Sequence, residues 1–422
     1  MLRPTLACSL LALAAPACTS SGDPPEVKSD LARNMTPSNA DVPQLVHDNT
    51  AFAADLYGQV AAAAPKDNLF LSAHSISTAL AMTYAGAETT TASQMAATMH
   101  FTLPPAQLHA AFDALDLALA SRATSADSTT IPFQLHNASS LWGQTGMDFQ
   151  QPFLDTLAVN YGAGLRVQDF VKDPEGSRGT INDWVSKETN DKIPDLLGPG
   201  TITTETRFVI ANAIYFTAAW QDPFKEGDTT NDAFTNVSGE SVTVPTLHGG
   251  GEWEYASAAG YEAVEIPYDG GQLGMIVVVP DDLATFEASL DGETIEGIES
   301  ALHGAAITLS MPKFEFSSPF SLKDALQALG MTSAFGEDAD FSGIDGARDI
   351  FIAAVLHKGF LHIDEKGTEA AAATAVIGAG DAEEEQHTVV VNKPFLIFIH
   401  DRPTNAILFQ GRMADPSQAQ GE

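Results

Sequence analysis

The chain has 422 residues, of which 44% are hydrophobic and 18% charged, and this composition is typical of a globular protein. The formal net charge of −35 and the absence of a Lys/Arg-rich stripe argue against nucleic acid, an anionic membrane surface or a heparin-like polyanion as a partner. The only two cysteines, Cys8 and Cys18, lie near the N-terminus, which excludes a disulfide framework within the fold.

The first residues have the pattern of an export signal. Arg3 precedes an apolar run from Leu6 to Ala15 that is too short for a stable membrane anchor, so residues 1–17 are interpreted as a signal peptide. The segment that ends at Cys18 resembles the lipobox of bacterial lipoproteins, although Ala15 stands where a larger aliphatic residue is usual. Lipidation of Cys18 is favoured, with ordinary signal cleavage and a free Cys18 thiol as the alternative.

We therefore expect an exported protein, extracellular or in the cell envelope, and an outer-membrane lipoprotein if Cys18 is lipidated. A lipid anchor would be the only contact with a membrane. Residues 18–41 are rich in Ser, Pro, Asp and Asn and lack apolar periodicity, which predicts a flexible tether.

Two helices are expected next, followed mostly by strands. Leu45, Phe52, Leu56 and Val60 recur at helical spacing, and residues 75–85 form a second helical pattern that begins just after Ser72. The later elements are apolar runs typical of buried strands, a hairpin signal at Asp269-Gly270-Gly271, one more helical stretch and three C-terminal strands. These later elements lie at 131–142, 207–220, 264–279, 320–329, 389–391, 395–399 and 406–409.

Helices first and strands later, without a regular βαβ alternation, predict an α+β fold. We expect one large domain over residues 42–417, followed by a short tail at 418–422.

Sequence motifs of common enzymes are absent. The chain has no His-Glu-x-x-His, no Cys-x-x-Cys, no nucleophile elbow and no phosphate-binding loop. His248-Gly249-Gly250-Gly251 resembles an esterase oxyanion loop but is interpreted as a plain loop, because no nucleophile elbow accompanies it. The acidic stretch from Asp338 to Asp349 has part of a calcium-loop spacing, but Asp349 replaces the closing Glu. We expect no catalytic activity, no metal and no cofactor.

The most unusual stretch runs from Glu365 to Gln386. It begins with charged residues and Gly367, continues through four alanines and ends in a flexible acidic segment, with a predicted strand on either side. A long loop inside a compact domain is uncommon and tends to be functional.

Glu365-Lys366-Gly367-Thr368-Glu369-Ala370-Ala371-Ala372-Ala373 resembles the reactive-loop hinge of inhibitory serpins. The resemblance extends over residues 42–416, with one departure at Ala73, where the family usually has Pro. Further matching motifs lie at 68–76, 208–216 with Trp220 and Pro223-Phe224, 340–344, His357-Lys358, Asn392-Lys393-Pro394-Phe395 and 409–413.

The resemblance implies a single serpin domain with three β-sheets, about nine helices and an exposed reactive-centre loop. It also implies a monomeric suicide inhibitor whose partner is a target serine protease. That protease cleaves the loop and is trapped as a covalent acyl-enzyme while the loop inserts into the main sheet as a new strand. A non-inhibitory serpin that acts as a binding module and an inhibitor of a cysteine protease are the alternatives.

With the family's register, the inserted loop would turn only small or β-branched, uncharged residues toward the core, namely Thr368, Ala370, Ala372, Thr374 and Val376. Non-inhibitory members often carry bulky or charged residues in the hinge, so this pattern favours inhibition. Glu369 would be the only charged residue on the outward face.

Two further sites follow from the resemblance. At the top of the main sheet, called the breach, Glu365 would pair with Lys313 near Trp220. Beneath the centre of the sheet, polar residues would form the shutter, namely Ser72, Ser75, Asn212 and His357.

The scissile bond stays open. Counting from Glu365 places it at Asp381-Ala382, and counting back from Asn392 places it near Glu383-Glu384. Cleavage after Ala379 or Val376 would suit an elastase- or subtilisin-like protease. Trypsin-like targets are disfavoured because no Arg or Lys lies between Lys366 and Lys393.

Overall fold

The computed structural model describes residues 23–122, 134–368 and 386–419. The proposed signal peptide and Cys18 lie outside these residues. Within them the chain forms ten α-helices and three short 3₁₀ turns around mixed β-sheets, which confirms the α+β class. The helices are α1 (Val42–Ala63), α2 (Ala73–Tyr84), α3 (Thr89–Thr98), α4 (Pro105–Arg122), α5 (Gln151–Tyr161), α6 (Pro174–Glu188), α7 (Leu283–Ala288), α8 (Gly292–Ala301), α9 (Lys323–Ala328) and α10 (Ser342–Asp345).

The main sheet has seven strands in the order β1-β4-β3-β5-β12-β11, with β13 paired to the end of β5. The central strand β5 is buried along its whole length, as its apolar run predicts for a strand covered on both faces. The strands are β1 (Glu26–Val27), β4 (Leu165–Gln168), β3 (Gln134–Gln144), β5 (Phe208–Ala219), β12 (Ala354–Ile363), β11 (Phe314–Ser321) and β13 (Gly367–Thr368).

The other nine strands form one hydrogen-bonded sheet, which consists of two parts that share β7. The first half of β7 pairs with β6 and the second half with β8 on the same edge, while β10 and then β14 follow on the other edge. With these two parts counted separately, the described residues form the three sheets that were expected. The strands are β2 (Leu69–Leu71), β6 (Thr230–Thr235), β7 (Ser241–Ala258), β8 (Tyr261–Pro267), β9 (Leu273–Pro280), β10 (His303–Pro312), β14 (Gln386–Val390), β15 (Phe395–Asp401) and β16 (Ala406–Met413).

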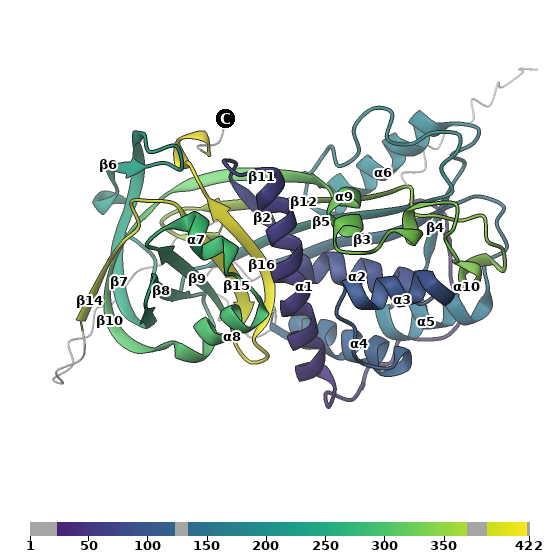
Figure 1. Ribbon diagram of the computed structural model, residues 1–422, viewed down its shortest axis with the longest axis horizontal. Helices are drawn as coiled ribbons and strands as arrows, with labels where there is room; N and C mark the ends of the chain where they lie inside the picture. The colour runs from purple at the N-terminus through teal and green to yellow at the C-terminus, as the bar shows by residue number, and fades with distance from the viewer. Residues whose placement is uncertain (1–22, 123–133, 369–385, 420–422) are drawn as a thin grey trace, which may run out of the picture.

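Helices cover both faces of the main sheet, with α6 on one face and α2 on the other (Figure 1). Because strand side chains alternate, β5 contributes to two separate cores. Val209, Ala211 and Ala213 join the α6 core, whereas Ile210 and Ile214 join the larger core with α2.

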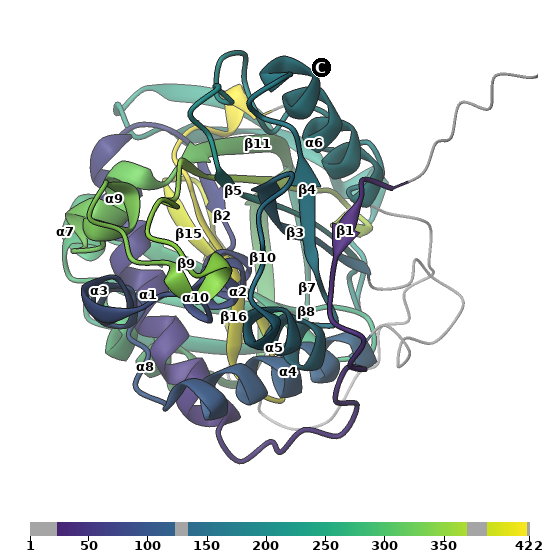
Figure 2. The same ribbon diagram turned by 90° about the vertical axis from the view of Figure 1, so that its right-hand side faces the viewer.

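The N-terminal segment differs from the flexible tether that its composition predicted. Residues 26–27 pair with β4 as an edge strand, and the segment then passes α5 and α4 on its way to α1 (Figure 2). Arg33 donates to Asp113 at 2.7 Å and to Asp116 at 2.6 Å, and the N–H of Asn34 donates to the carbonyl of Val159 at 2.9 Å. Backbone pairing and the ion pairs of Arg33 therefore hold residues 26–34 against the domain, which apolar periodicity alone could not indicate.

The start of α2 shows what the departure at Ala73 means. Ser72 is extended and caps the helix, because its hydroxyl accepts a hydrogen bond from the Ser75 N–H. Ala73 is the first helical residue, a position that favours proline. An extended residue such as Ser72 is also the conformation required before proline.

We therefore expect Ala73→Pro to stabilise the native protein by about 0.5–1 kcal/mol, mainly by restricting the unfolded chain. Chemical unfolding of the two proteins at pH 7 measures the difference. Ala81→Pro, in the interior of the same helix, serves as the control and should destabilise by about 3 kcal/mol or more. Destabilisation by Ala73→Pro would show that the helix start is strained.

Among the described residues, no helix is both long enough and apolar enough to cross a bilayer.

Candidate functional site

The main sheet contains a seam where two central strands run parallel. Residues Val209 to Tyr215 of β5 lie opposite Ala354 to Phe360 of β12, and we call these paired residues the seam. The pairing ends at Tyr215 and Phe360, although both strands continue beyond them. Parallel pairing is slightly less stable per residue than antiparallel pairing. Among the pairings made by β5 and β12, the seam is therefore the one expected to open at the lowest cost.

Beyond the closed seam, the start of the hinge already occupies the space beside β5. Gly367 and Thr368 form β13, which pairs antiparallel with Ala219 and Ala218. Gly367 has φ of +152°, and a Cβ there would lie 2.2 Å from the carbonyl oxygen of Ala218. Only glycine fits this approach, which explains the Gly in the hinge motif.

The predicted pair of Glu365 and Lys313 is present in the breach. The Lys313 ammonium lies 2.6 Å from Glu365 Oε2, and the Thr229 hydroxyl donates to Oε1 at 2.7 Å. Burial opposes ionisation of Glu365, but these two hydrogen bonds outweigh it and lower the pKa of the carboxyl. An ionised Glu365 thus ties the base of the hinge to the start of β11.

Trp220 completes the breach, together with Tyr268, which the sequence analysis did not single out. The Trp220 indole N–H donates to the carbonyl of Asp364 at 3.0 Å, and its ring stacks on Tyr268 at 4.7 Å. The Tyr268 hydroxyl lies 2.9 Å from the hydroxyl of Thr368. No motif marks Tyr268, because its role depends on a contact with Thr368, which lies 100 residues further along the chain.

The shutter residues also come together, on the face of the seam opposite α6. Asn212 and His357 are direct partners across the seam, and His357 Nδ1 lies 2.5 Å from Asn212 Oδ1. The Asn212 amide donates to the Ser75 hydroxyl at 2.7 Å and to the Ser139 hydroxyl at 2.6 Å. The hydroxyl of Ser72 donates to the carbonyl of Leu408 at 2.6 Å, which joins the shutter to β16.

His357 must be neutral in this network. The backbone N–H of Ser72 points at its Nε2 at 3.1 Å, so Nε2 accepts and Nδ1 carries the proton that is donated to Asn212. Complete burial lowers the pKa of His357 to about 3. The neutral tautomer with its proton on Nδ1 therefore satisfies the hydrogen bonds of both ring nitrogens.

Ser139 is the shutter residue that the sequence analysis missed. It lies on β3, directly opposite Asn212, and its hydroxyl is within 3.1 Å of that of Ser75. Two adjacent serines, Ser139 and Ser140, lie between Ala138 and the apolar pair Leu141-Trp142. The hydroxyls beside these apolar residues are the only signal in the sequence that could have found it.

Several predicted site residues lie outside the described residues. These are the hinge positions from Glu369 to Ala373 and the candidate cleavage positions Val376, Ala379, Asp381, Ala382, Glu383 and Glu384.

The features considered for an enzyme or a calcium site have structural roles. His248 to Gly251 lie within β7, paired to β10. Asp340 is bound by Thr89 and Ser342 hydroxyls and by Arg348 at 2.8 Å, so its oxygens are already engaged. In the described part of the chain, no three His, Cys, Asp or Glu side chains converge as metal ligands.

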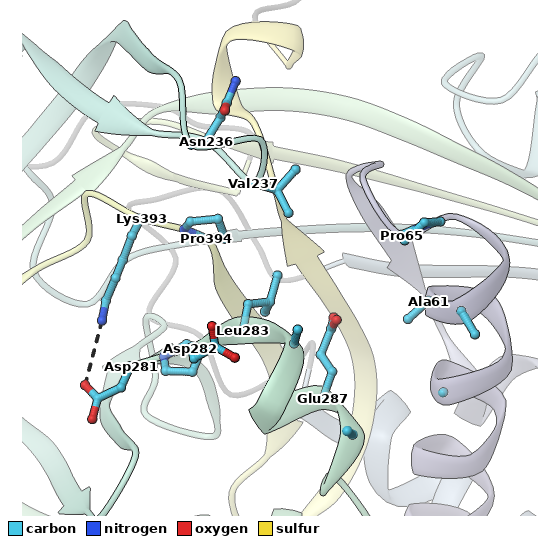
Figure 3. Close-up of a pocket in the computed structure, with 16 residues that line it drawn as sticks. Ala61, Pro65, Asn236, Val237, Asp281, Asp282, Leu283, Glu287, Lys393 and Pro394 are labelled. Carbon is cyan, nitrogen blue, oxygen red and sulfur yellow. Dashed lines mark ion pairs between the residues drawn. The ribbon is translucent and has the colours of Figure 1, made fainter.

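A surface pocket of about 530 Å³ lies elsewhere, between the end of α1, the start of α7 and residues 393–394 (Figure 3). Its lysine, Lys393, faces Asp281 at 3.8 Å, while Glu287 binds Arg412 at 3.0 Å. None of the hinge, breach or shutter residues lines it.

Comparison with known proteins agrees with this geometry. Residues 47–416 match the family model described as "Serpin (serine protease inhibitor)". The chain is 34% identical over 384 residues to the leukocyte elastase inhibitor of Bos taurus, covering 88% of this chain and 100% of that protein. It is 33% identical over 392 residues to antithrombin-III of Mus musculus, covering 90% and 83%. The chain belongs to the serpin family.

Solved serpin structures have the same architecture. The native state of tengpin, a thermophilic serpin, superposes with a TM-score of 0.82 at 26% identity and covers 93% of this chain and all of that one. Native protease nexin-1 with heparin superposes with a TM-score of 0.78 at 26% identity and covers 89% and 100%.

The breach ion pair gives one prediction. Lys313→Met removes the main partner of a carboxylate that is only 9% exposed, so we expect the native protein to lose about 1–3 kcal/mol of stability. Urea unfolding at pH 7 measures this. Lys225→Met, at an exposed lysine in the same region, is the matched control and should change stability by less than about 0.5 kcal/mol. Equal effects in the two variants would contradict a specific role for the pair.

The shutter histidine gives a second prediction, in pH dependence. Unfolded His357 takes up a proton below its ordinary pKa of 6.5, whereas the native group stays neutral down to about pH 3. Stability must therefore fall as the pH decreases through this window, by about 2–3 kcal/mol between pH 7 and pH 4.5.

Other groups also titrate in this range, so the contribution of His357 is isolated with His357→Gln. The Gln amide can still accept from Ser72 and donate to Asn212, but it cannot be protonated. Unfolding at pH 7 and pH 4.5 should show a smaller pH dependence for the variant, by about 2–3 kcal/mol. An unchanged pH dependence would mean that His357 has the same pKa in the native and unfolded states.

Proposed function

We propose that this serpin is a suicide inhibitor of serine proteases. The target cleaves the reactive loop and forms an acyl-enzyme, and the freed hinge then inserts into the seam between β5 and β12. The observation that carries this proposal is the pairing of β13 with β5 directly beyond the closed seam.

Strand direction explains why insertion would be favourable. β12 runs parallel to β5, whereas β13 runs antiparallel to it. A strand that continues β13 into the seam would be antiparallel to both neighbours, so one parallel ladder would be exchanged for two antiparallel ones. About a dozen added residues, each worth on the order of 1 kcal/mol, could supply roughly 10 kcal/mol.

The side chains of the hinge suit that path. Thr368 is 1% exposed and faces Tyr268, in agreement with the inward register expected for it. Continuing the register places Ala370 opposite Phe216, whose side chain is fully buried. A small, uncharged residue is required there because a charge would be stranded in the core.

The proposal is tested by incubating the protein with serine proteases of different specificity. These include elastase-like and subtilisin-like enzymes and enzymes that cleave after Asp or Glu. We expect an SDS-resistant adduct with at least one of them, with mass spectrometry of the released fragment identifying the scissile bond. Cleavage by every enzyme without any adduct would overturn the proposal. An adduct formed only with a cysteine protease would replace it with the cross-class alternative.

A hinge variant tests the mechanism separately. Ala370→Glu should convert the protein into a substrate, with an adduct yield at least about tenfold lower, because the carboxylate would have to enter the core during insertion. Ala370→Ser keeps a small, uncharged side chain and is the matched control, for which the adduct should persist. Adduct yields are read by denaturing gel electrophoresis after a fixed excess of protease. An undiminished yield for Ala370→Glu would rule out insertion along this register.

A further inference from the structure

The turn that follows α6 holds a strained backbone. Asn190 and Asp191 both have positive φ, of 50° and 61°, which residues other than glycine rarely adopt in succession. The N–H of Asp191 donates to the carbonyl of Ser186 at 2.7 Å, and the hydroxyl of Ser186 donates to the Asp191 carboxylate at 2.8 Å. These bonds fix the turn to the last turn of α6 and determine where the next residue points.

That next residue is Lys192, and its ammonium lies over two aromatic rings of the main sheet. The nitrogen is 5.4 Å from the ring centre of Phe360 and 5.9 Å from that of Tyr215, both within the range of a cation–π contact. Ile193, the following residue, is fully buried in the α6 core and anchors the segment. Lys192 is thereby held over the sheet from both sides.

The position of the two rings makes this contact unusual. Tyr215 and Phe360 are direct partners across the seam, and theirs is the last pair before the strands separate. Their rings lie 6.1 Å apart on the face of the sheet that α6 covers. Lys192 therefore contacts both sides of the seam at the pair that must part first when the sheet opens.

We propose that Lys192, Tyr215 and Phe360 form a clasp that holds the seam closed and limits the rate at which the hinge enters it. The proposal rests on the insertion mechanism of the proposed function and assigns to Lys192 a positioning role in it. The clasp acts through the sheet and does not contact the protease.

Insertion must break the clasp. An added strand moves its two neighbours apart by about 5 Å. Continuing the register of β13 places Ala371 opposite Tyr215, so its methyl group would come between the two rings. The ammonium then loses its simultaneous contact with both rings. The contact therefore stabilises the closed seam and not the inserted state.

The clasp also connects the seam to α6. Because the turn at Asn190 and Asp191 is bonded to Ser186, the backbone of Lys192 is held to the end of α6, and the ammonium leaves the rings either by rotation of the lysine side chain or by a change in this turn. The left-handed turn therefore fixes the position from which Lys192 reaches the seam.

The test measures how fast the uncleaved protein takes up a synthetic peptide with the sequence of residues 368–381. Lys192→Met keeps the length of the side chain and removes the charge, and we expect uptake to be roughly three- to tenfold faster. Lys192→Arg retains a cation over the rings and should stay within about twofold of the unmodified protein. Lys172→Met, at an exposed lysine just before α6, is the matched control and should have no effect.

Two further measurements separate the clasp from a general loss of stability. In a Phe360→Leu background, Lys192→Met should have a smaller effect, because one of the two rings is already gone. The cleaved, inserted forms of the unmodified protein and of the Lys192→Met variant should have the same thermal unfolding midpoint, since the clasp is absent from the inserted form. A lower midpoint for the variant in both the uncleaved and the inserted form would overturn the proposal.

The outcomes also distinguish this inference from the proposed function. If the unmodified protein takes up the peptide and gains thermal stability on loop cleavage, but Lys192→Met proceeds at the same rate, only the clasp is overturned. If the unmodified protein neither takes up the peptide nor gains stability on cleavage, insertion itself fails and both proposals are overturned.

Discussion

The structure depends on the parallel pairing of β5 and β12. These strands lie at the centre of the main sheet, and both faces of β5 are covered, by α6 on one side and by α2 on the other. A buried parallel ladder is stable enough to hold the fold and weaker than the antiparallel ladders that could replace it. The breach, the clasp and the shutter are all arranged along this seam. The breach lies beyond its open end, the Lys192 clasp lies at its last pair, and the shutter lies further along it.

The polar groups of the seam show why the closed state is specific. A buried polar pair stabilises a structure only when its hydrogen bonds are satisfied, and the bond between His357 and Asn212 is supported on both sides by Ser72, Ser75 and Ser139. A protonated imidazole would present an N–H to the N–H of Ser72. The network therefore requires a neutral ring, and burial maintains it by keeping the pKa of His357 low.

Much of the fold could be predicted from the sequence because its elements have clear patterns. The apolar run of β5, the helical spacing of α1 and the glycines between β8 and β9 correspond to the elements that the structure contains. The N-terminal segment could not be predicted in this way. Its attachment depends on a two-residue strand and on the contact of Arg33 with Asp113, which lie 80 residues apart in the chain. Neither feature has a periodicity that a sequence pattern could reveal.

The residues of the candidate site also fall into those that the sequence could indicate and those that it could not. Glu365, Lys313, Asn212 and His357 were found because they belong to recognisable motifs, and the structure brings each pair together. Tyr268 and Lys192 were missed because their roles arise from tertiary contacts alone. Lys192 follows a helix in a polar stretch, where a lysine is expected to be solvated. Only the left-handed turn before it directs the side chain onto the sheet.

The register of β13 connects the loop sequence to both faces of the seam. Counting from the pairing of Thr368 with Ala218, the inserted strand would place Ala371 opposite Tyr215 and Thr374 opposite Asn212. Opening the seam removes the bond between Asn212 and His357, and a hydroxyl at position 374 would arrive on the inward face at that level. Opening also separates the rings beneath Lys192, and a methyl group at position 371 would fit between them. The loop thus carries a polar group at the level where the shutter loses a hydrogen bond. It carries a small apolar group at the level where the clasp is released. A strand that replaces both contacts requires these two kinds of side chain at these two positions.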